Sequence, residues 1–382
     1  MSENRLAFIY PPLAEQLSYP ADCPFKTERA GLTRQRLLSL GLLGNNRQFE
    51  VPAEPAPRDA LEKFHTARYL DELQRAAKGD LTPLGLQMGL GGPDTPVFPA
   101  MYEYSALACG ASLKGAELLL DGAADVAFNL LGGFHHAMPE FAAGFCYLND
   151  AVLACDFLAN AGKRVFYLDI DAHHADGVQF AFYRRNDVMT VSFHESGKTL
   201  FPWGGFEDEI GEGAGLGYNV NLSLPPGTFD AAYLAAFDQL VPPLVQAFKP
   251  DLFVLELGMD TLAGDPLTHL NLTNNVHVEI VKRMQSFEKP VLVLGGGGYN
   301  VENTVRGWAL AWLTFSGADQ EHDPSAGFGG IMLGSTEWTG GLRDPQKPVS
   351  EPQRRAVEPE LRVNLRAVIE RVFPLHGIGI QT

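Results

Sequence analysis

The sequence lacks any apolar run of the roughly 18 residues that a membrane-spanning helix needs, which argues against a membrane protein. Cysteine is scarce, with four residues and no C-x-x-C pair, which argues against a disulfide framework or a cysteine zinc site. Positive charge is also scarce: 29 Lys and Arg against 46 Asp and Glu leave a net charge of −17, which disfavours nucleic-acid binding. Charges and prolines replace the apolar core of a secretion signal near the first residue, so we expect a cytoplasmic protein.

The composition is that of a globular protein, because 46% of the 382 residues are hydrophobic and 24 of them are Phe. No linker rich in Pro, Gly or Ser divides the chain. We therefore expect a single domain over residues 1–382, with a catalytic core at about 10–316 and an irregular stretch and helix at 317–382. A helical stripe in that last segment packs on the body or on a partner subunit, which leaves a homo-oligomer open.

Short apolar runs that end in glycines, acids or histidines recur along the chain, at 125–136, 164–174, 187–195, 251–260 and 289–299. Continuous rather than alternating apolar residues are typical of strands buried on both faces. Helical spacing lies between and before them, at Leu61–Ala76, Phe141–Leu158 and Phe229–Phe248. This alternation predicts an α/β fold with a parallel sheet flanked by helices on both faces, while residues 1–60 look less regular.

Acids and histidines follow one of these runs, and ligand crevices form at such carboxyl ends of parallel strands. In an extended segment Asp169, Asp171 and His173 share one face, and Asp260 ends a second run. Asp171, His173 and Asp260 would give three ligands and an open position, as in catalytic metal sites. Their oxygen and nitrogen atoms suit Zn²⁺, and Fe²⁺, Mn²⁺ or Co²⁺ are also compatible. A charged loop with local Asp–His pairing is the alternative.

Groups for proton transfer follow other runs. His135 and His136 come after a Gly-Gly turn, and Asp169 and Asp176 remain to orient these imidazoles. Tyr299 follows four glycines and could donate a hydrogen bond to an oxyanion. A plain strand-to-helix turn with a packed tyrosine is the alternative for this last motif.

Together these residues resemble the zinc-dependent histone deacetylase family, which includes bacterial histone-deacetylase-like and acetoin-utilisation-type deacetylases. The resemblance spans about residues 10–316 and is carried by motifs at Gly132–His136, Gly144–Asp150, Asp169–Gly177, Leu257–Asp260, Asn271–Thr273 and Gly295–Tyr299. It implies the arginase/deacetylase fold, with a central eight-stranded parallel sheet.

The resemblance also implies roles for single residues. It makes Asp171, His173 and Asp260 the ligands of one zinc ion. His136 becomes the general base and acid, His135 its protonated partner, and Tyr299 the oxyanion donor. The substrate would be bound by Phe145, Phe201, Asp94, Gly144, Leu267 and Gly297. A structural K⁺ would lie at Asp169, Asp171, His173, Ser192 and Phe193, and a second one at Phe182, Val188 and Tyr218.

Two departures from the family pattern leave the acyl-chain preference open. Met259 stands where many relatives carry Ala, and Trp203-Gly204-Gly205 replaces a Gly-Thr-Gly-type stretch. No corepressor-type tail follows the catalytic region, which favours a prokaryotic cytoplasm over a histone substrate.

The sequence thus predicts hydrolysis of an N-acyl amide by zinc-bound water, with acyl-lysine in a peptide or protein as the expected substrate. An acylated small amine, as in an acetylpolyamine deacetylase, is the alternative substrate. A two-metal ureohydrolase is less favoured because Ala175 stands where its bridging acid would be. A sensor on an inactive scaffold is disfavoured because no catalytic residue is missing.

Overall fold

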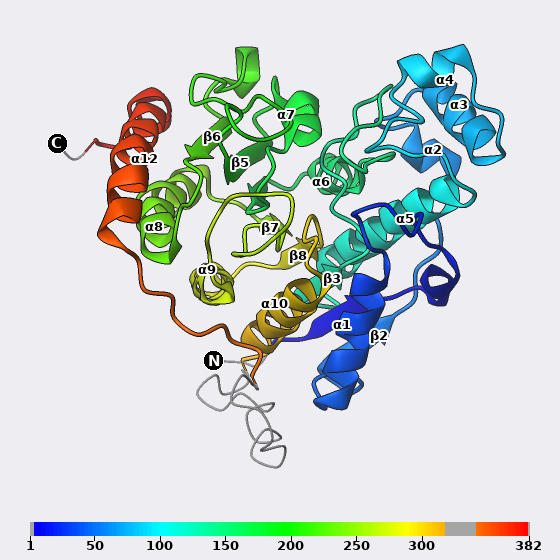
Figure 1. Cartoon of the computed structure of the whole chain (residues 1–382), viewed down its shortest axis with the longest axis horizontal. Helices are drawn as coiled ribbons and strands as arrows, with labels where there is room; N and C mark the ends of the chain where they lie inside the picture. The colour runs from blue at the N-terminus through cyan, green and yellow to red at the C-terminus, as the bar shows by residue number, and fades with distance from the viewer. Residues whose placement is uncertain (1–3, 318–340, 381–382) are drawn as a thin grey trace.

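A single sheet of eight parallel strands forms the centre of the molecule, as the sequence predicted (Figure 1). The computed structural model describes residues 4–317 and 341–380. The sheet order is β2-β1-β3-β8-β7-β4-β5-β6. The strands are β1 (Leu6–Ile9), β2 (Gln48–Val51), β3 (Val126–Asn129), β4 (Val165–Asp169), β5 (Val188–Glu195), β6 (Asn219–Leu224), β7 (Leu252–Glu256) and β8 (Val291–Leu294).

Both faces of the sheet are apolar, which explains the continuous apolar runs in the sequence. Successive side chains of a strand point to opposite faces. In β4, Phe166 and Leu168 belong to one buried apolar cluster, and Val165 and Tyr167 belong to the other. Each face therefore needs its own covering layer of helices.

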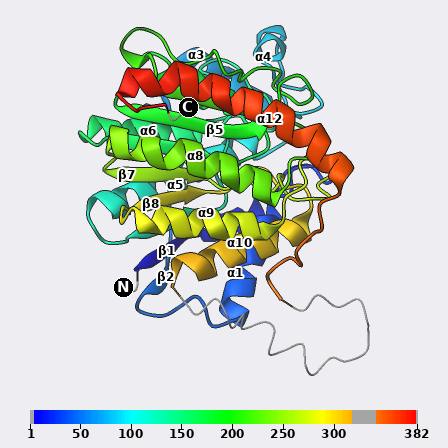
Figure 2. The same cartoon turned by 90° about the vertical axis from the view of Figure 1, so that its left-hand side faces the viewer.

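Helices provide these two layers (Figures 1 and 2). Figure 2 shows α8, α9, α10 and α12 lying across one face, and α1 packs on α10. On the other side α5, α6 and α7 contact β3, β4 and β5 respectively. The helices are α1 (Glu28–Ser39), α2 (Arg58–Leu61), α3 (Ala67–Ala77), α4 (Pro83–Gln87), α5 (Met101–Leu120), α6 (Asp150–Asn160), α7 (Asp176–Phe182), α8 (Asp230–Phe248), α9 (Asn274–Ser286), α10 (Val301–Phe315) and α12 (Glu351–Val372), with 3₁₀ turns η1 (Pro12–Gln16), η2 (Gly213–Gly215) and η3 (Phe373–His376). Among the described helices, none has the length and apolarity to cross a membrane.

Several local expectations were wrong. Residues 1–60 contain β1 and β2 as well as α1, although their prolines suggested irregular structure. The helix expected at Leu61–Ala76 is two helices, because the chain leaves α2 and Thr66 caps a new helix by accepting a hydrogen bond from Tyr69 N. The helix expected from Phe141 begins only at Asp150, where Asn149 caps it.

The predicted C-terminal helix is α12. Its apolar residues Leu361, Leu365, Val368 and Val372 are buried, and the helix contacts β6 and α8 of the same chain. Part of the irregular stretch that precedes it, residues 318–340, lies outside the described residues.

Candidate metal centre and active site

The candidate site lies at the carboxyl edge of the sheet. The loops after β3, β4, β7 and β8 carry, in that order, the two histidines, the Asp169–Gly177 segment, Asp260 and Tyr299. Parallel strands end at the same edge, so these loops meet although they are far apart in the sequence.

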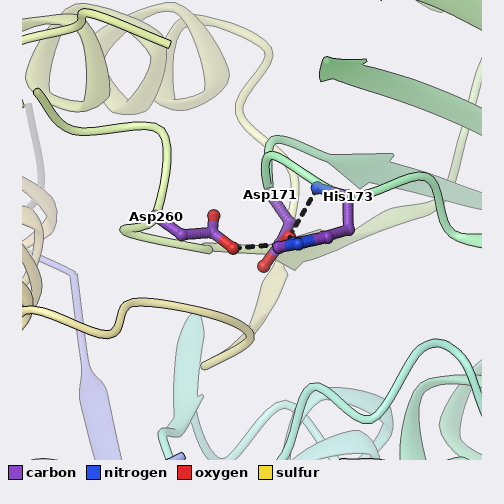
Figure 3. A group of neighbouring side chains, drawn as sticks. All are labelled: Asp171, His173 and Asp260. Carbon is purple, nitrogen blue, oxygen red and sulfur yellow. Dashed lines mark hydrogen bonds and ion pairs between the residues drawn. The ribbon is translucent and has the colours of Figure 1, made fainter. Parts of the chain in front are cut away.

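Three side chains converge on one point, as Figure 3 shows for Asp171, His173 and Asp260. All three are buried, and their ligand atoms lie within 4.8 Å of one another. His173 Nδ1 is 2.9 Å from Asp260 Oδ2 and 3.1 Å from Asp171 Oδ1. Apart from this imidazole nitrogen, Asp260 Oδ2 has no hydrogen-bond donor among the described residues. Two buried carboxylates that share one imidazole nitrogen are costly unless a cation binds them, so this donor set fits a metal ion.

Backbone groups hold the two carboxylates in place. Asp260 Oδ1 accepts a hydrogen bond from Ala172 N at 2.9 Å, and Asp171 Oδ2 accepts one from Gly297 N at 2.6 Å. The glycine is required, because a Cβ at position 297 would lie 2.1 Å from Asp260 Oδ2. Gly258 is confined in the same way, since its Cβ would lie 2.2 Å from Asp171 Oδ2. The glycines therefore admit the carboxylates to the centre of the site.

The electrostatics of the triad also favour a cation. Burial and the nearby charge of Asp171 raise the pKa of Asp260 to about 7. Burial alone would lower the pKa of His173, but hydrogen bonds and charges from Asp171 and Asp260 raise it to about 10. Without a metal, the triad therefore keeps protons that a divalent cation would displace. Nitrogen and oxygen donors without sulfur are compatible with Zn²⁺ and with Fe²⁺.

The two adjacent histidines lie beside the triad, and each has its Nδ1 on a carboxylate. His135 Nδ1 is 2.8 Å from Asp169 Oδ2, and His136 Nδ1 is 2.7 Å from Asp176 Oδ1. Their Nε2 atoms are 3.0 Å apart. The sequence missed Tyr167, whose hydroxyl donates to Asp169 Oδ2 at 2.6 Å. It looked like an ordinary apolar strand residue, and only its alternation with Asp169 on one strand could have indicated the contact.

The two imidazoles differ in charge. Burial opposes a proton on His135, but the charge of Asp169 and its hydrogen bond raise the pKa of His135 well above its usual value. Burial and the positive charge of His135 lower the pKa of His136 to about 4, although Asp176 opposes this shift. At neutral pH the pair therefore contains one imidazolium and one neutral imidazole.

Tyr299 approaches the triad from the loop after β8. Its ring centroid is 6.2 Å from that of His173 and 5.7 Å from that of Phe145. Burial raises the pKa of Tyr299 well above 10, so the hydroxyl keeps its proton. Asp265, which the sequence analysis also missed, accepts from Tyr299 N at 2.8 Å and from Leu267 N at 2.9 Å. The Leu267 segment is thereby fixed beside Tyr299.

Of the two predicted aromatic walls, Phe201 lies beside His136 and Phe145 lies beside Tyr299. The Phe201 ring lies 5.0 Å from that of His136. At Gly144 a Cβ would lie 2.5 Å from His136 Cδ2, so this position has no room for a side chain. Asp94 Oδ2 accepts from Gly144 N, and Asp94 O accepts from Phe145 N, each at 2.9 Å. The loop of Asp94 thus fixes the turn that presents Phe145.

A buried arginine binds backbone carbonyls of the loop that contains Gly295–Gly298. Arg29 donates to Gly298 O at 2.8 Å and to Gly296 O at 3.0 Å. It went unnoticed in the sequence because residues 1–60 offered no motif. Glu256, at the end of β7, is also fully buried, and its Oε1 has no hydrogen-bond partner within residues 4–317 and 341–380.

The residues predicted to bind K⁺ fall into two places. Asp169 and Ser192 are neighbours in the register of β4 and β5, with Phe193 next along β5. Val188 begins β5, Phe182 ends α7, and Tyr218 O accepts from Thr190 N at 2.9 Å. The second group therefore lies toward the other end of β5.

Comparisons with known proteins agree with this arrangement. The histone deacetylase domain family matches residues 23–315. Histone deacetylase RPD3 of Saccharomyces cerevisiae is 39% identical over 316 residues, which cover 81% of this chain and 71% of that protein. The acetoin utilization protein AcuC of Bacillus subtilis is 36% identical and covers 83% of each chain. A crystal structure of a histone deacetylase homologue complexed with SAHA superposes with a TM-score of 0.83 and 31% identity, covering 96% of this chain and 100% of that one. The fold is therefore the arginase/deacetylase fold that the sequence predicted.

Proposed function

This chain belongs to the histone deacetylase family, and we propose that it hydrolyses acyl-lysine amides at the site around Asp171, His173 and Asp260. One observation carries the proposal. The buried imidazoles of His135 and His136 lie beside the three metal donors, and the Nδ1 atom of each lies within hydrogen-bond distance of a carboxylate. The three donors would hold one Zn²⁺, with Fe²⁺ as the alternative ion. K⁺ would bind at the two groups of residues named for it above and stabilise the surrounding loops.

Bound Zn²⁺ supplies Lewis acidity to the scissile carbonyl and to the attacking water. The remaining steps fall to side chains of this chain. His136 is neutral at neutral pH, so its Nε2 accepts a proton from the water while Asp176 holds Nδ1. The charge of His135 makes the protonated His136 a stronger acid. His136 then transfers its proton to the departing amine.

Tyr299 would stabilise the oxyanion that forms from the amide carbonyl. Its hydroxyl stays protonated and is therefore available as a donor throughout the reaction. Phe145 and Phe201 would contact the aliphatic part of the lysine, with Leu267 nearby. Asp94 at the rim would bind the substrate backbone, and the backbone of Gly144 and Gly297 would contact the substrate.

Several finer expectations remain predictions. No observation favours an acylated polyamine over acyl-lysine as the substrate. The experiment below therefore includes an acylated polyamine for comparison. A two-metal reaction has less support, because in the described part of the chain one group of three donors comes within ligand distance and position 175 is Ala. The prokaryotic cytoplasm and the single domain over 1–382 also stay predictions, and the relatives include both yeast and Bacillus proteins.

The direct test measures amine release from an acetyl-lysine peptide, from longer acyl-lysine peptides and from N-acetylputrescine, using protein of known metal content. We expect hydrolysis of the peptides to require one Zn²⁺ or Fe²⁺ per chain. Asp176→Asn should keep the metal and lose turnover, because His136 loses its orienting carboxylate. Faster hydrolysis of N-acetylputrescine would favour the polyamine substrate, and inactivity of the loaded enzyme on every amide would refute the proposal.

A further inference from the structure

Trp203 combines two features that folding alone does not explain. The residue is 64% exposed, and its backbone has a φ of 67°. Only Gly adopts this left-handed region without a steric cost. A bulky apolar side chain in water contributes little to folding. The backbone conformation therefore costs free energy that burial of the side chain does not offset. This indicates that Trp203 has a functional role rather than a structural one.

The segment around Trp203 is held firmly on both sides. Before it, Thr199 Oγ1 donates to Glu195 Oε1 at 3.0 Å. After it, Gly205 N and Phe206 N donate to Glu209 Oε1 at 3.0 and 2.9 Å. The exposed indole is thus presented by a rigid turn, which reduces the entropy lost when a ligand packs against it.

This turn belongs to the wall of the active site. Phe201, two residues before Trp203, packs its ring 5.0 Å from His136. The fully buried Glu195 also accepts from His269 N at 2.7 Å and lies 2.8 Å from His269 Nδ1. His269 lies two residues beyond Leu267, so one carboxylate joins the loops that bear Phe201 and Leu267. The position of Trp203 is therefore fixed relative to both walls.

We propose that Trp203 is a specificity-determining residue that contacts the substrate outside the pocket, and that the substrate is accordingly a polypeptide. This inference rests on the proposed function. A small acylated amine would end near the mouth of the pocket, whereas a peptide continues past it. An indole face packs on peptide planes and attracts Arg and Lys side chains, and the net charge of −17 favours such cationic neighbours. A peptide with Arg or Lys beside the acyl-lysine is the expected ligand.

The test compares Trp203→Gly and Trp203→Ala with the wild-type enzyme on an Arg-flanked acetyl-lysine peptide and on N-acetylputrescine. For the peptide we expect KM to rise about tenfold in both variants with kcat little changed. For N-acetylputrescine we expect kcat/KM to stay within about twofold. The melting temperature of Trp203→Gly should not fall, because Gly accepts the left-handed backbone. Phe157→Ala, which truncates a 37% exposed aromatic on α6, should leave kcat and KM unchanged for both substrates.

Equal losses on both substrates together with a lower melting temperature in Trp203→Gly would overturn the inference, because the residue would then be structural. Unchanged kinetics on the peptide would overturn it as well. A wild-type enzyme that hydrolyses no acylated amide would overturn the proposed function and this inference together, so the two failures are distinguishable.

Discussion

Replacement of Tyr299 by Phe removes one hydroxyl from the active site and little else. The ring contact with Phe145, at 5.7 Å, and the hydrogen bond from the backbone N to Asp265, at 2.8 Å, do not involve the hydroxyl. We therefore expect the melting temperature and the metal content of Tyr299→Phe to match those of the wild type. The effect should be confined to turnover.

The size of the effect follows from the role of an oxyanion donor. Loss of one such donor costs about 3 kcal/mol of transition-state stabilisation, so kcat should fall between about 100-fold and 1000-fold. Because burial raises the pKa of Tyr299 well above 10, the hydroxyl stays protonated between about pH 6 and 9. The ratio of the wild-type to the variant kcat should therefore be constant over this range.

The assay is steady-state hydrolysis of an acetyl-lysine peptide by Zn²⁺-loaded protein at several pH values. Tyr102→Phe, on α5, makes the same chemical change outside the loop of Tyr299 and should retain normal turnover. A Tyr299→Phe enzyme with near-normal kcat and one metal per chain would remove Tyr299 from the oxyanion role.

Three further changes probe the metal donors and the buried groups. Adding Zn²⁺ to chelator-treated protein should stabilise the wild type by about 2.7 kcal/mol at a hundredfold excess over Kd, and should raise the melting temperature far less in Asp260→Asn. Gly297→Ala should weaken Zn²⁺ binding, measured by competition with a chelating dye, because its Cβ would lie 2.1 Å from Asp260 Oδ2; Gly379→Ala, with open space around it, should bind normally. Burial lowers the pKa of His65 to about 3, so below pH 6.5 the unfolded chain takes up a proton that the native chain does not. His65 should therefore contribute a fall of about 1.4 kcal/mol per pH unit to the free energy of unfolding in urea from pH 6.5 toward 3, in addition to the falls from other buried histidines such as His136 and His277. His65→Gln should make the slope shallower by that amount.

Sequence patterns predicted those elements whose structure depends on residues close together in the sequence. The apolar runs at 164–174 and 251–260 correctly marked β4 and β7, because strands buried on both faces need apolar side chains at every position. The same criterion missed β2, whose residues are only half-buried at the edge of the sheet. Thr66 and Asn149 were missed as helix starts, since a cap depends on one hydrogen bond that periodicity does not register.

Long-range contacts limited the prediction of the site. The sequence proposed Asp171, His173 and Asp260 as a set, and the fold brings them together. Asp265 and Arg29 escaped notice because each acts through backbone groups of a distant loop: Asp265 binds Tyr299 N, and Arg29 binds Gly298 O. No spacing along the chain encodes a contact across 269 residues.

The residues that perform the chemistry differ in their surroundings from the residue proposed to determine substrate specificity. Asp171 and Asp260 follow β4 and β7, strands with neighbours on both sides in the sheet, and backbone N–H groups fix their carboxylates. Substitutions at such positions would disturb the buried carboxylates, so the residues at the strand ends determine the reaction. Trp203, by contrast, stands on an exposed turn after β5 and outside the metal donors. Substitutions in that turn should therefore alter which acylated peptide binds without altering how the amide bond is broken, because they leave the metal donors and the imidazole pair in place.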